Sequence, residues 1–131
     1  LAGGPGTPLT LTVQGHPLAI PQFRNGVARA SFVDLCAKPL GASDYIEIAS
    51  EFHTVLLGGI PLFDGRNDDP ARRFVTAIDE FYDRHVNLVC TADASPVKLY
   101  SGERLAHAFE RTASRLIEMQ SAEYLAREHL T

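Results

Sequence analysis

Apolar side chains recur every three or four residues between positions 71 and 85, and they are Phe74, Ile78, Phe81 and Tyr82. This spacing predicts an amphipathic helix with one apolar stripe. Asp69 can cap the free amides at the start of the helix, and Pro70 suits the first helical position. The mostly apolar run 86–92 follows directly and predicts a short buried strand. A helix that leads straight into a buried strand is the building unit of a parallel α/β sheet, and this is the fold class that we expect.

The beginning of the chain shows the period-two pattern of a strand. Residues 1–8 are rich in glycine and proline and are interpreted as a flexible lead-in. Leu9, Leu11 and Val13 alternate with threonines, which predicts a first strand, and Gly15-His16-Pro17 is expected to turn the chain.

Two further strands are expected after this turn. Residues 18–23 can form a return strand, which Pro21 would confine to the edge of a sheet. Asn25-Gly26 is a tight-turn signal, because both central positions of that turn need positive φ. A third strand at 27–32 then completes a small β meander over 9–32, for which an irregular β-rich linker is the alternative interpretation.

Helices and strands are expected to alternate over 33–131, so that 9–131 forms one α/β region. The expected elements are a loop or short helical turn at 34–41, a helix at 44–51, a buried strand at 53–57, loops at 63–68 and 93–101, a long helix at 102–120 and a short terminal helix at 121–128. Ser43 is the expected cap of the helix at 44–51, whose inward side chains are Tyr45, Ile46 and Ala49. The long helix carries a stripe that should pack on the sheet, made of Leu105, Phe109, Thr112, Leu116 and Met119.

Composition and charge exclude several classes of function. A formal net charge of −4 argues against broad binding to nucleic acid or anionic lipid. The chain is 45% apolar, yet no apolar run approaches the length of a membrane span. Cys36 and Cys90 are interpreted as core thiols of a reducing compartment. Because the chain begins at Leu1 and its only methionine is Met119, we expect it to be a C-terminal piece of a longer protein.

Residue spacing gives no support for metal or nucleophilic chemistry. The five histidines have no metal-ligand spacing with one another or with either cysteine. The sequence contains no G-x-S-x-G elbow. Gly58-Gly59 follows an expected strand but lacks the spacing and the lysine of a phosphate-binding loop. An independent small enzyme is therefore poorly supported.

Arginines are the candidate functional residues. Arg104, Arg111 and Arg115 would fall within a ~40° sector of the last helix. Arg111 and Arg115 are four residues apart, which is mildly destabilising unless an anion or carboxylate lies near, and Glu118 is three residues beyond Arg115. One interpretation is a solvated face with local salt bridges, and the other is a contact with phosphate or an acidic segment. Arg72-Arg73 is a second candidate pair, because cations at a helix N-terminus oppose the helix dipole.

Four stretches together resemble one protein family. They are FVDLCAKPLGASDYIEIA (32–49), FHTVLLGGIP (52–61), ARRFVTAIDEFYDRHVNLVCTADAS (71–95) and FERTASRLIEMQSAEYL (109–125). In this order and spacing they resemble the C-terminal portion of the ZapE-type ATPases, also called the lactation-elevated-protein or AFG-one-like family. The resemblance extends over about 11–125, and its most specific parts are ARRF, IDEFYDR and RTASRLIEMQSAEYL.

The resemblance implies the C-terminal part of a P-loop, AAA-like ATPase with an αβα sandwich, preceded here by the β meander. The intact protein would bind ATP and Mg²⁺ through motifs before Leu1. This chain lacks the phosphate-binding loop and the acidic pair, so we expect it to hold no cofactor or metal and to be inactive alone. Members of the family are bacterial cytoplasmic proteins of the division ring, or mitochondrial proteins linked to turnover of inner-membrane proteins. The implied partners are the upstream ATPase domain, other copies of the protein, and a division-ring or membrane-associated protein, but not nucleic acid.

The resemblance also suggests roles for two arginines. Leu88–Thr91, Pro96, Leu99-Tyr100 and Arg111 run in an order similar to the end of the family's catalytic half, so this half is interpreted as its degenerate echo. Arg111 and Arg115 are then candidate catalytic arginines, acting on nucleotide in cis or from a neighbouring subunit.

Two other roles remain open for the arginines. They can be structural, paired with Glu118 or with a helix carboxylate such as Asp79 or Asp83. They can also form the binding face of a non-catalytic interaction module for an acidic partner, with Arg72, Arg73 and Arg104 as further contacts.

Overall fold

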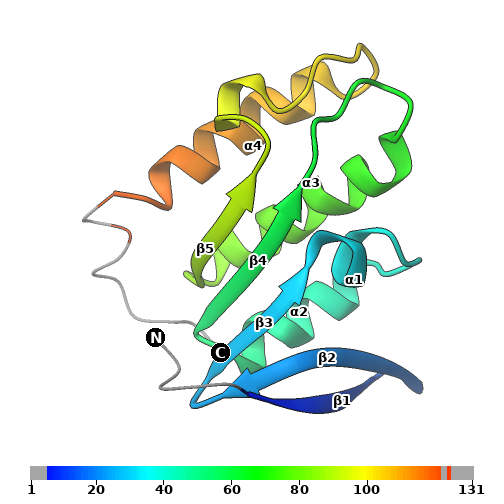
Figure 1. Ribbon diagram of the computed structural model, residues 1–131, viewed down its shortest axis with the longest axis vertical. Helices are drawn as coiled ribbons and strands as arrows, with labels where there is room; N and C mark the ends of the chain where they lie inside the picture. Colours follow the sequence, from blue (N-terminus) through cyan, green and yellow to red (C-terminus); the bar gives the residue numbers. More distant parts are fainter. Residues whose placement is uncertain (1–5, 122–123, 125–131) are drawn as a thin grey trace.

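A computed structural model describes residues 6–121 and Tyr124, and it contains one five-stranded sheet with helices on one of its faces (Figure 1). The elements are β1 (Thr7–Val13), β2 (His16–Arg24), β3 (Val27–Ser31), α1 (Phe32–Cys36), α2 (Ala42–Glu51), β4 (Thr54–Ile60), α3 (Asp68–Asp83), β5 (Asn87–Ala92), the short 3₁₀-helix η1 (Pro96–Lys98) and α4 (Ala106–Glu118). The strands lie across the sheet in the order in which they occur in the chain. The expected α/β fold is confirmed. The lead-in predicted at 1–8 is described only from residue 6, and it is wrong at Thr7 and Pro8, which belong to β1. The terminal helix predicted at 121–128 lies largely outside the described residues.

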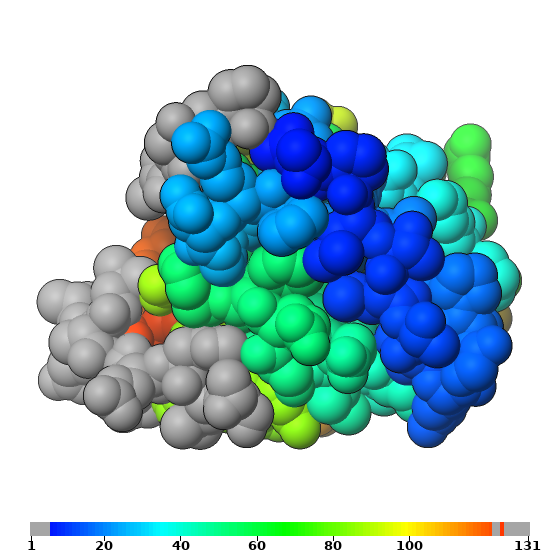
Figure 2. All heavy atoms as spheres, turned by 90° about the horizontal axis from the view of Figure 1, so that it is seen from below, coloured from blue at the N-terminus to red at the C-terminus, as the bar shows by residue number. Residues whose placement is uncertain are grey.

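The first three strands form the expected antiparallel meander. Asn25 and Gly26 have φ of 52° and 79°, as the tight turn between β2 and β3 requires. The first turn is made by Gln14 and Gly15, not by residues 15–17, because His16 already pairs with Val13. His16 also ties the hairpin to α2, since its Nε2 lies 2.6 Å from Oδ1 of Asp44. Figure 2 shows this hairpin in blue against the cyan-to-green segment that includes α2.

The prediction that Pro21 places its strand at a sheet edge is wrong. β2 lies between β1 and β3. Pro21 falls in the gap between two paired stretches, because β1 pairs with Ile20 and Phe23 across an irregularity and β3 pairs only from Gln22 onward. A proline is tolerated there because no neighbouring strand pairs with it.

The remaining strands, β3, β4 and β5, are parallel to one another. The crossovers between them carry α1, α2 and α3, and Figure 1 shows these helices and α4 on the same side of the sheet. Right-handed crossovers that always step in one direction place every helix on one face. No helix among the described residues covers the opposite face of the three parallel strands, which we call the outer face.

Helix starts differ from the expected ones by a few residues. α1 has the Ser31–Asp34 capping box, and α2 begins after Gly41, whose amide donates to Asp44 at 2.8 Å, so Ser43 is not the cap. α3 begins after Asn67, so the predicted cap Asp69 and first residue Pro70 both lie inside its first turn. Proline is tolerated there because its missing amide would have had no helical partner.

Both long helical stripes are confirmed as the core. On α3 the side chains of Phe74, Ile78 and Phe81 are buried, whereas Tyr82, the fourth residue of the predicted stripe, is only partly buried at the edge of the core. The predicted stripe on α4 is buried along its whole length, at Leu105, Phe109, Thr112, Leu116 and Met119. In α2 the inward side chains are Tyr45, Ile48 and Ala49, and Ile46 is only half-buried, because the i, i+3, i+4 spacing from Tyr45 selects Ile48.

The prediction that 86–92 is buried is wrong. Val86 is fully buried, but it precedes β5, and the last four side chains of β5 are exposed. Cys90 is among them, so only Cys36 is a core thiol. The physical reason is position: β5 is the last strand of the sheet, and its outer face has no covering layer among the described residues. None of the described helices combines the length and the apolar character needed to span a membrane.

Candidate functional site

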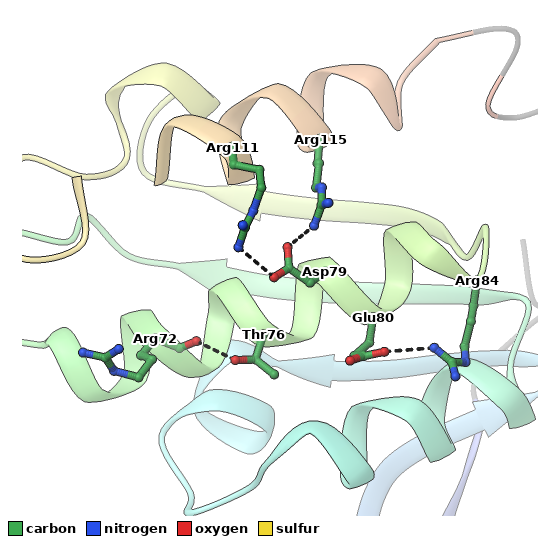
Figure 3. A network of polar contacts seen from close by, with 7 residues as sticks. All are labelled: Arg72, Thr76, Asp79, Glu80, Arg84, Arg111 and Arg115. Carbon is green, nitrogen blue, oxygen red and sulfur yellow. Dashed lines mark hydrogen bonds and ion pairs between the residues drawn. The ribbon is translucent and has the colours of Figure 1, made fainter. Parts of the chain in front are cut away.

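Two arginines of α4 meet one carboxylate of α3. Nη2 of Arg111 donates to Oδ2 of Asp79 at 3.2 Å, and Nη1 of Arg115 donates to Oδ1 of the same carboxylate. Figure 3 shows both guanidinium groups pointing from α4 toward Asp79 on α3. The arrangement binds the last helix to the central helix, and it places two positive charges on one negative charge.

Arg115 makes a second contact within this cluster. Its guanidinium carbon lies 4.9 Å from the centre of the Tyr82 ring, a cation–π geometry. The Tyr82 hydroxyl donates to Glu118 at 2.6 Å. Glu118 therefore contacts Tyr82, and no ion pair joins it to Arg115 among the described residues. The cluster of Asp79, Tyr82, Arg111, Arg115 and Glu118 is called the α3–α4 clamp below.

The other charged candidates are not brought together with this cluster. Arg104 precedes the first residue of α4, so it does not share a helical sector with Arg111 and Arg115 as predicted. Its side chain and that of Arg72 are exposed, and neither has an ion pair within the described part of the chain. Arg73 instead donates to the carbonyl oxygen of Cys36 at 3.1 Å and so fixes α1 to α3.

Asp83 stands apart from the clamp although it lies on the same helix as Asp79. It is exposed at the last residue of α3, and the described residues offer it no ion pair. The neighbouring pair in Figure 3 is Arg84 with Glu80, at 2.9 Å. Asp83 is thus an aspartate on the same helix as Asp79 that forms no ion pair with any described residue.

The buried titratable groups are structural. Burial raises the pKa of the Cys36 thiol to about 12, and burial raises the pKa of Tyr45 as well. The Tyr45 hydroxyl donates to the carbonyl oxygen of Leu35 at 2.7 Å. A thiol held protonated is a poor nucleophile. Within the described residues, no group of three or more histidine, cysteine or acidic side chains could hold a metal ion.

Sequence reasoning missed the outer face of the sheet. Arg29, Leu56 and Val89 lie side by side across β3, β4 and β5. They line a cavity of about 540 Å³ together with Gly58, Thr91 and other residues of the strand ends. Val89 is 51% exposed, and Arg29 is exposed as well. The signal in the sequence was the apolar character of Leu56 and Val89, because parallel strands need a layer on each face. Only the structure shows that the described helices supply one of these layers.

The fold and the clamp define an α/β region with parallel strands and helices, consistent with a portion of a P-loop ATPase. The family described as AFG1-like ATPase matches residues 2–128 of the chain. The cell division protein ZapE of Escherichia coli (strain K12) is 44% identical over 121 residues, which cover 92% of this chain and 32% of that protein. Lactation elevated protein 1 homolog B of Danio rerio is 34% identical over 149 residues, covering 89% of this chain and 30% of that protein.

The chain therefore belongs to the AFG1-like ATPase family and is a ZapE-type region of it. It spans about a third of the length of the curated relatives that it matches. No solved structure matches the chain.

Proposed function

We propose that this region completes the α/β fold of a ZapE-type ATPase and has no hydrolytic site of its own. The observation that carries the proposal is the outer face, where Leu56 and Val89 lie on parallel strands without a covering layer among the described residues. Parallel sheets are found with both faces covered, because their strands are apolar on both sides. The second layer would come from the rest of the ATPase, which in the relatives is about two thirds of the polypeptide.

The intact protein is proposed to bind ATP and Mg²⁺ and to hydrolyse ATP. Membership of an ATPase family supports this activity, and the motifs for it would lie outside the present sequence. The name of the Escherichia coli relative, cell division protein ZapE, supports a role in cell division. A place in the cytoplasm beside division-ring or membrane-associated proteins is proposed from the family resemblance alone. The mitochondrial alternative would apply to a eukaryotic source.

Within this proposal Arg111 and Arg115 have a structural role. The support is that both guanidinium groups already share the Asp79 carboxylate. Because Asp79 already pairs with both arginines, the alternative that they bind an acidic partner protein is less well supported. The test is turnover and thermal melting of the Arg111→Ala and Arg115→Ala variants of the full-length ATPase. We expect a lower melting temperature with a wild-type rate per folded molecule, whereas a loss of turnover by roughly 10³-fold at unchanged stability would assign them to catalysis.

The fold-completion proposal is tested by comparing two exposed valines. Val89→Asp puts a charge on the outer face, and Val33→Asp puts the same charge on α1, where the valine is 62% exposed. If the outer face is covered in the full-length protein, Val89→Asp should cost about 2–3 kcal/mol there and much less in the isolated chain, because only a covered site desolvates the carboxylate. Val33→Asp should cost little in both contexts.

The melting profile supplies a second criterion. A region that completes the fold unfolds together with the ATPase in one cooperative transition. Two separate transitions, with Val89→Asp equally harmless in both contexts, would contradict the proposal.

A further inference from the structure

β5 is the last strand of the sheet, and its far side is open among the described residues. β4 pairs with one side of β5, and none of the described strands pairs with the other. The side chains from Val89 to Ala92 are exposed. An edge of this kind presents a row of backbone donors and acceptors that another strand can pair with.

The backbone alternation identifies the groups on the open side. The amide of Asn87 donates to His53 at 2.9 Å and that of Asp93 donates to Ile60 at 3.0 Å, so odd-numbered residues of β5 face β4. Every second residue of a parallel strand faces the opposite neighbour. The amides of Leu88, Cys90 and Ala92 therefore point to the open edge.

β5 lacks the features that protect sheet edges. Natural edge strands carry charged side chains, proline or strong bulges that prevent pairing. The sequence of β5 is NLVCTA, with neither charge nor proline. At the opposite edge, β1 contains Pro8 and its pairing is irregular between Thr7 and Leu9. The β4–β5 pairing is also irregular, between Leu57 and Ile60, but the extra residue there belongs to β4. β5 is therefore an edge strand with which another β-strand can pair.

Space for the side chains of an added strand exists on both faces beside β5. On the helix side, a hollow of about 190 Å³ lies between β5 and α4, lined by residues that include Cys90, Ala92, Leu116 and Gln120. On the outer face, Val89 and Thr91 line the larger cavity. A strand placed beside β5 would alternate its side chains between the helix side and the outer face, where they would lie next to Val89 and Thr91.

We propose that a β-strand from the remaining part of the ATPase polypeptide pairs with β5 and extends the sheet. This inference rests on the proposed function, because it takes the rest of the ATPase as the source of the strand. The length of the relatives supports this occupant, since this chain matches only 32% and 30% of theirs. On the helix side the strand must supply uncharged side chains toward Leu116, because the residues that line this hollow are mainly apolar.

Hydrogen exchange of the Cys90 amide in the full-length ATPase tests the proposal. Selective ¹⁵N labelling of cysteine reduces the spectrum to a few signals, and Cys→Ser variants assign those of Cys36 and Cys90. Cys36, in helix α1 and fully buried, is the internal reference for the folded protein. We expect exchange at Cys90 to be slowed about 100-fold or more relative to a solvent-exposed amide, at all protein concentrations. Exchange of the Cys90 amide at nearly the rate of a solvent-exposed amide would overturn the proposal. Protection that disappears on dilution would also overturn it, because the strand paired with β5 would then come from a second copy of the protein.

Two substitutions at Cys90 distinguish a strand that is hydrogen-bonded to the edge of β5 from a segment that only shields this edge from solvent. Cys90→Ser keeps the amide and Cys90→Pro removes it. With a strand paired to β5, Cys90→Pro should abolish the protection of neighbouring edge amides and lower the melting temperature well below that of Cys90→Ser. Equal stability of the two variants would mean that the edge is covered but not paired, and strand addition would be wrong. A single melting transition with a rapidly exchanging Cys90 amide would refute strand addition and leave the proposed function standing.

Discussion

Removing the Asp79 carboxylate should destabilise the chain through both arginines of the α3–α4 clamp. In the Asp79→Ala variant Arg111 and Arg115 lose their shared partner and face each other on α4. The side chains of Arg115 and Asp79 are 26% and 25% exposed, so their bond should contribute near the lower end of the 1.5–3 kcal/mol of a charged hydrogen bond, about 1.5–2 kcal/mol. Arg111 is 56% exposed, and its pair should contribute about 0.5 kcal/mol.

Repulsion between the two unpaired arginines adds roughly 0.2–0.5 kcal/mol. The free energy of unfolding of Asp79→Ala should therefore be lower than that of the wild type by about 2–3 kcal/mol. For a chain of 131 residues, the loss corresponds to a fall in melting temperature of about 7–11 °C. Urea titration followed by circular dichroism measures the free energy of unfolding directly. Asp83→Ala is the matched control, because Asp83 lies on the same helix, is exposed and has no ion pair within the described part of the chain. This change should alter stability by less than about 0.5 kcal/mol.

Double-mutant cycles assign the loss to each arginine. The coupling of Asp79 with Arg115 should be about 1–2 kcal/mol, and the coupling with Arg111 should be below about 1 kcal/mol. An Asp79→Ala variant as stable as Asp83→Ala, or zero coupling with Arg115, would refute the reasoning. Such a result would make both arginines candidate catalytic or partner-binding residues again.

Three further predictions concern the core, the pH dependence and nucleotide. Phe74→Ala and Leu116→Ala should each cost about 3 kcal/mol in denaturant melts, because both side chains are buried between helices and sheet, and losses below about 1 kcal/mol would contradict this packing. Stability should fall as pH rises above about 9, by about 1.4 kcal/mol per pH unit for one group, because the unfolded state releases the Cys36 proton near the ordinary thiol pKa of 9.0 while the folded state holds it to about 12. This contribution is fully present below pH 9, and Cys36→Ala should reduce the slope in melts recorded between pH 8 and about 11. Calorimetric titration of the isolated chain with ATP and Mg²⁺ should show neither tight binding nor turnover, and micromolar binding would reveal a nucleotide site in this region.

The sequence was sufficient for the elements that depend on local pattern. The stripe of α4 and the residues Phe74, Ile78 and Phe81 of α3 were predicted correctly, because burial at i, i+3 and i+4 follows directly from helical geometry. The Asn25-Gly26 turn was predicted for a similar reason, since few residue pairs accept positive φ at both positions.

Features that depend on distant neighbours were not predictable in this way. The run 86–92 has the same apolar sequence whether its strand is central or at an edge, and only the strand order shows that β5 is the last one. Pro21 was misjudged because the gap in pairing around it is set by the register of two other strands. The partner of Arg115 lies 36 residues away on another helix, so the sequence could offer Asp79 only as one of several carboxylates.

The agreement between strand order and chain order has a consequence for how the molecule assembles. Each strand pairs with the strand that precedes it in the chain, so no segment has to wait for a distant one before it can join the sheet. The hairpin of β1 and β2 joins residues that are close in the chain and should form quickly. The parallel pairs join residues 27 and 33 positions apart, Val27 with Thr54 and Thr54 with Asn87, and should form more slowly. During synthesis the hairpin can form first and each β-α unit can then be added as it leaves the ribosome. The growing end of the sheet is always its newest strand, and for this region that strand is β5.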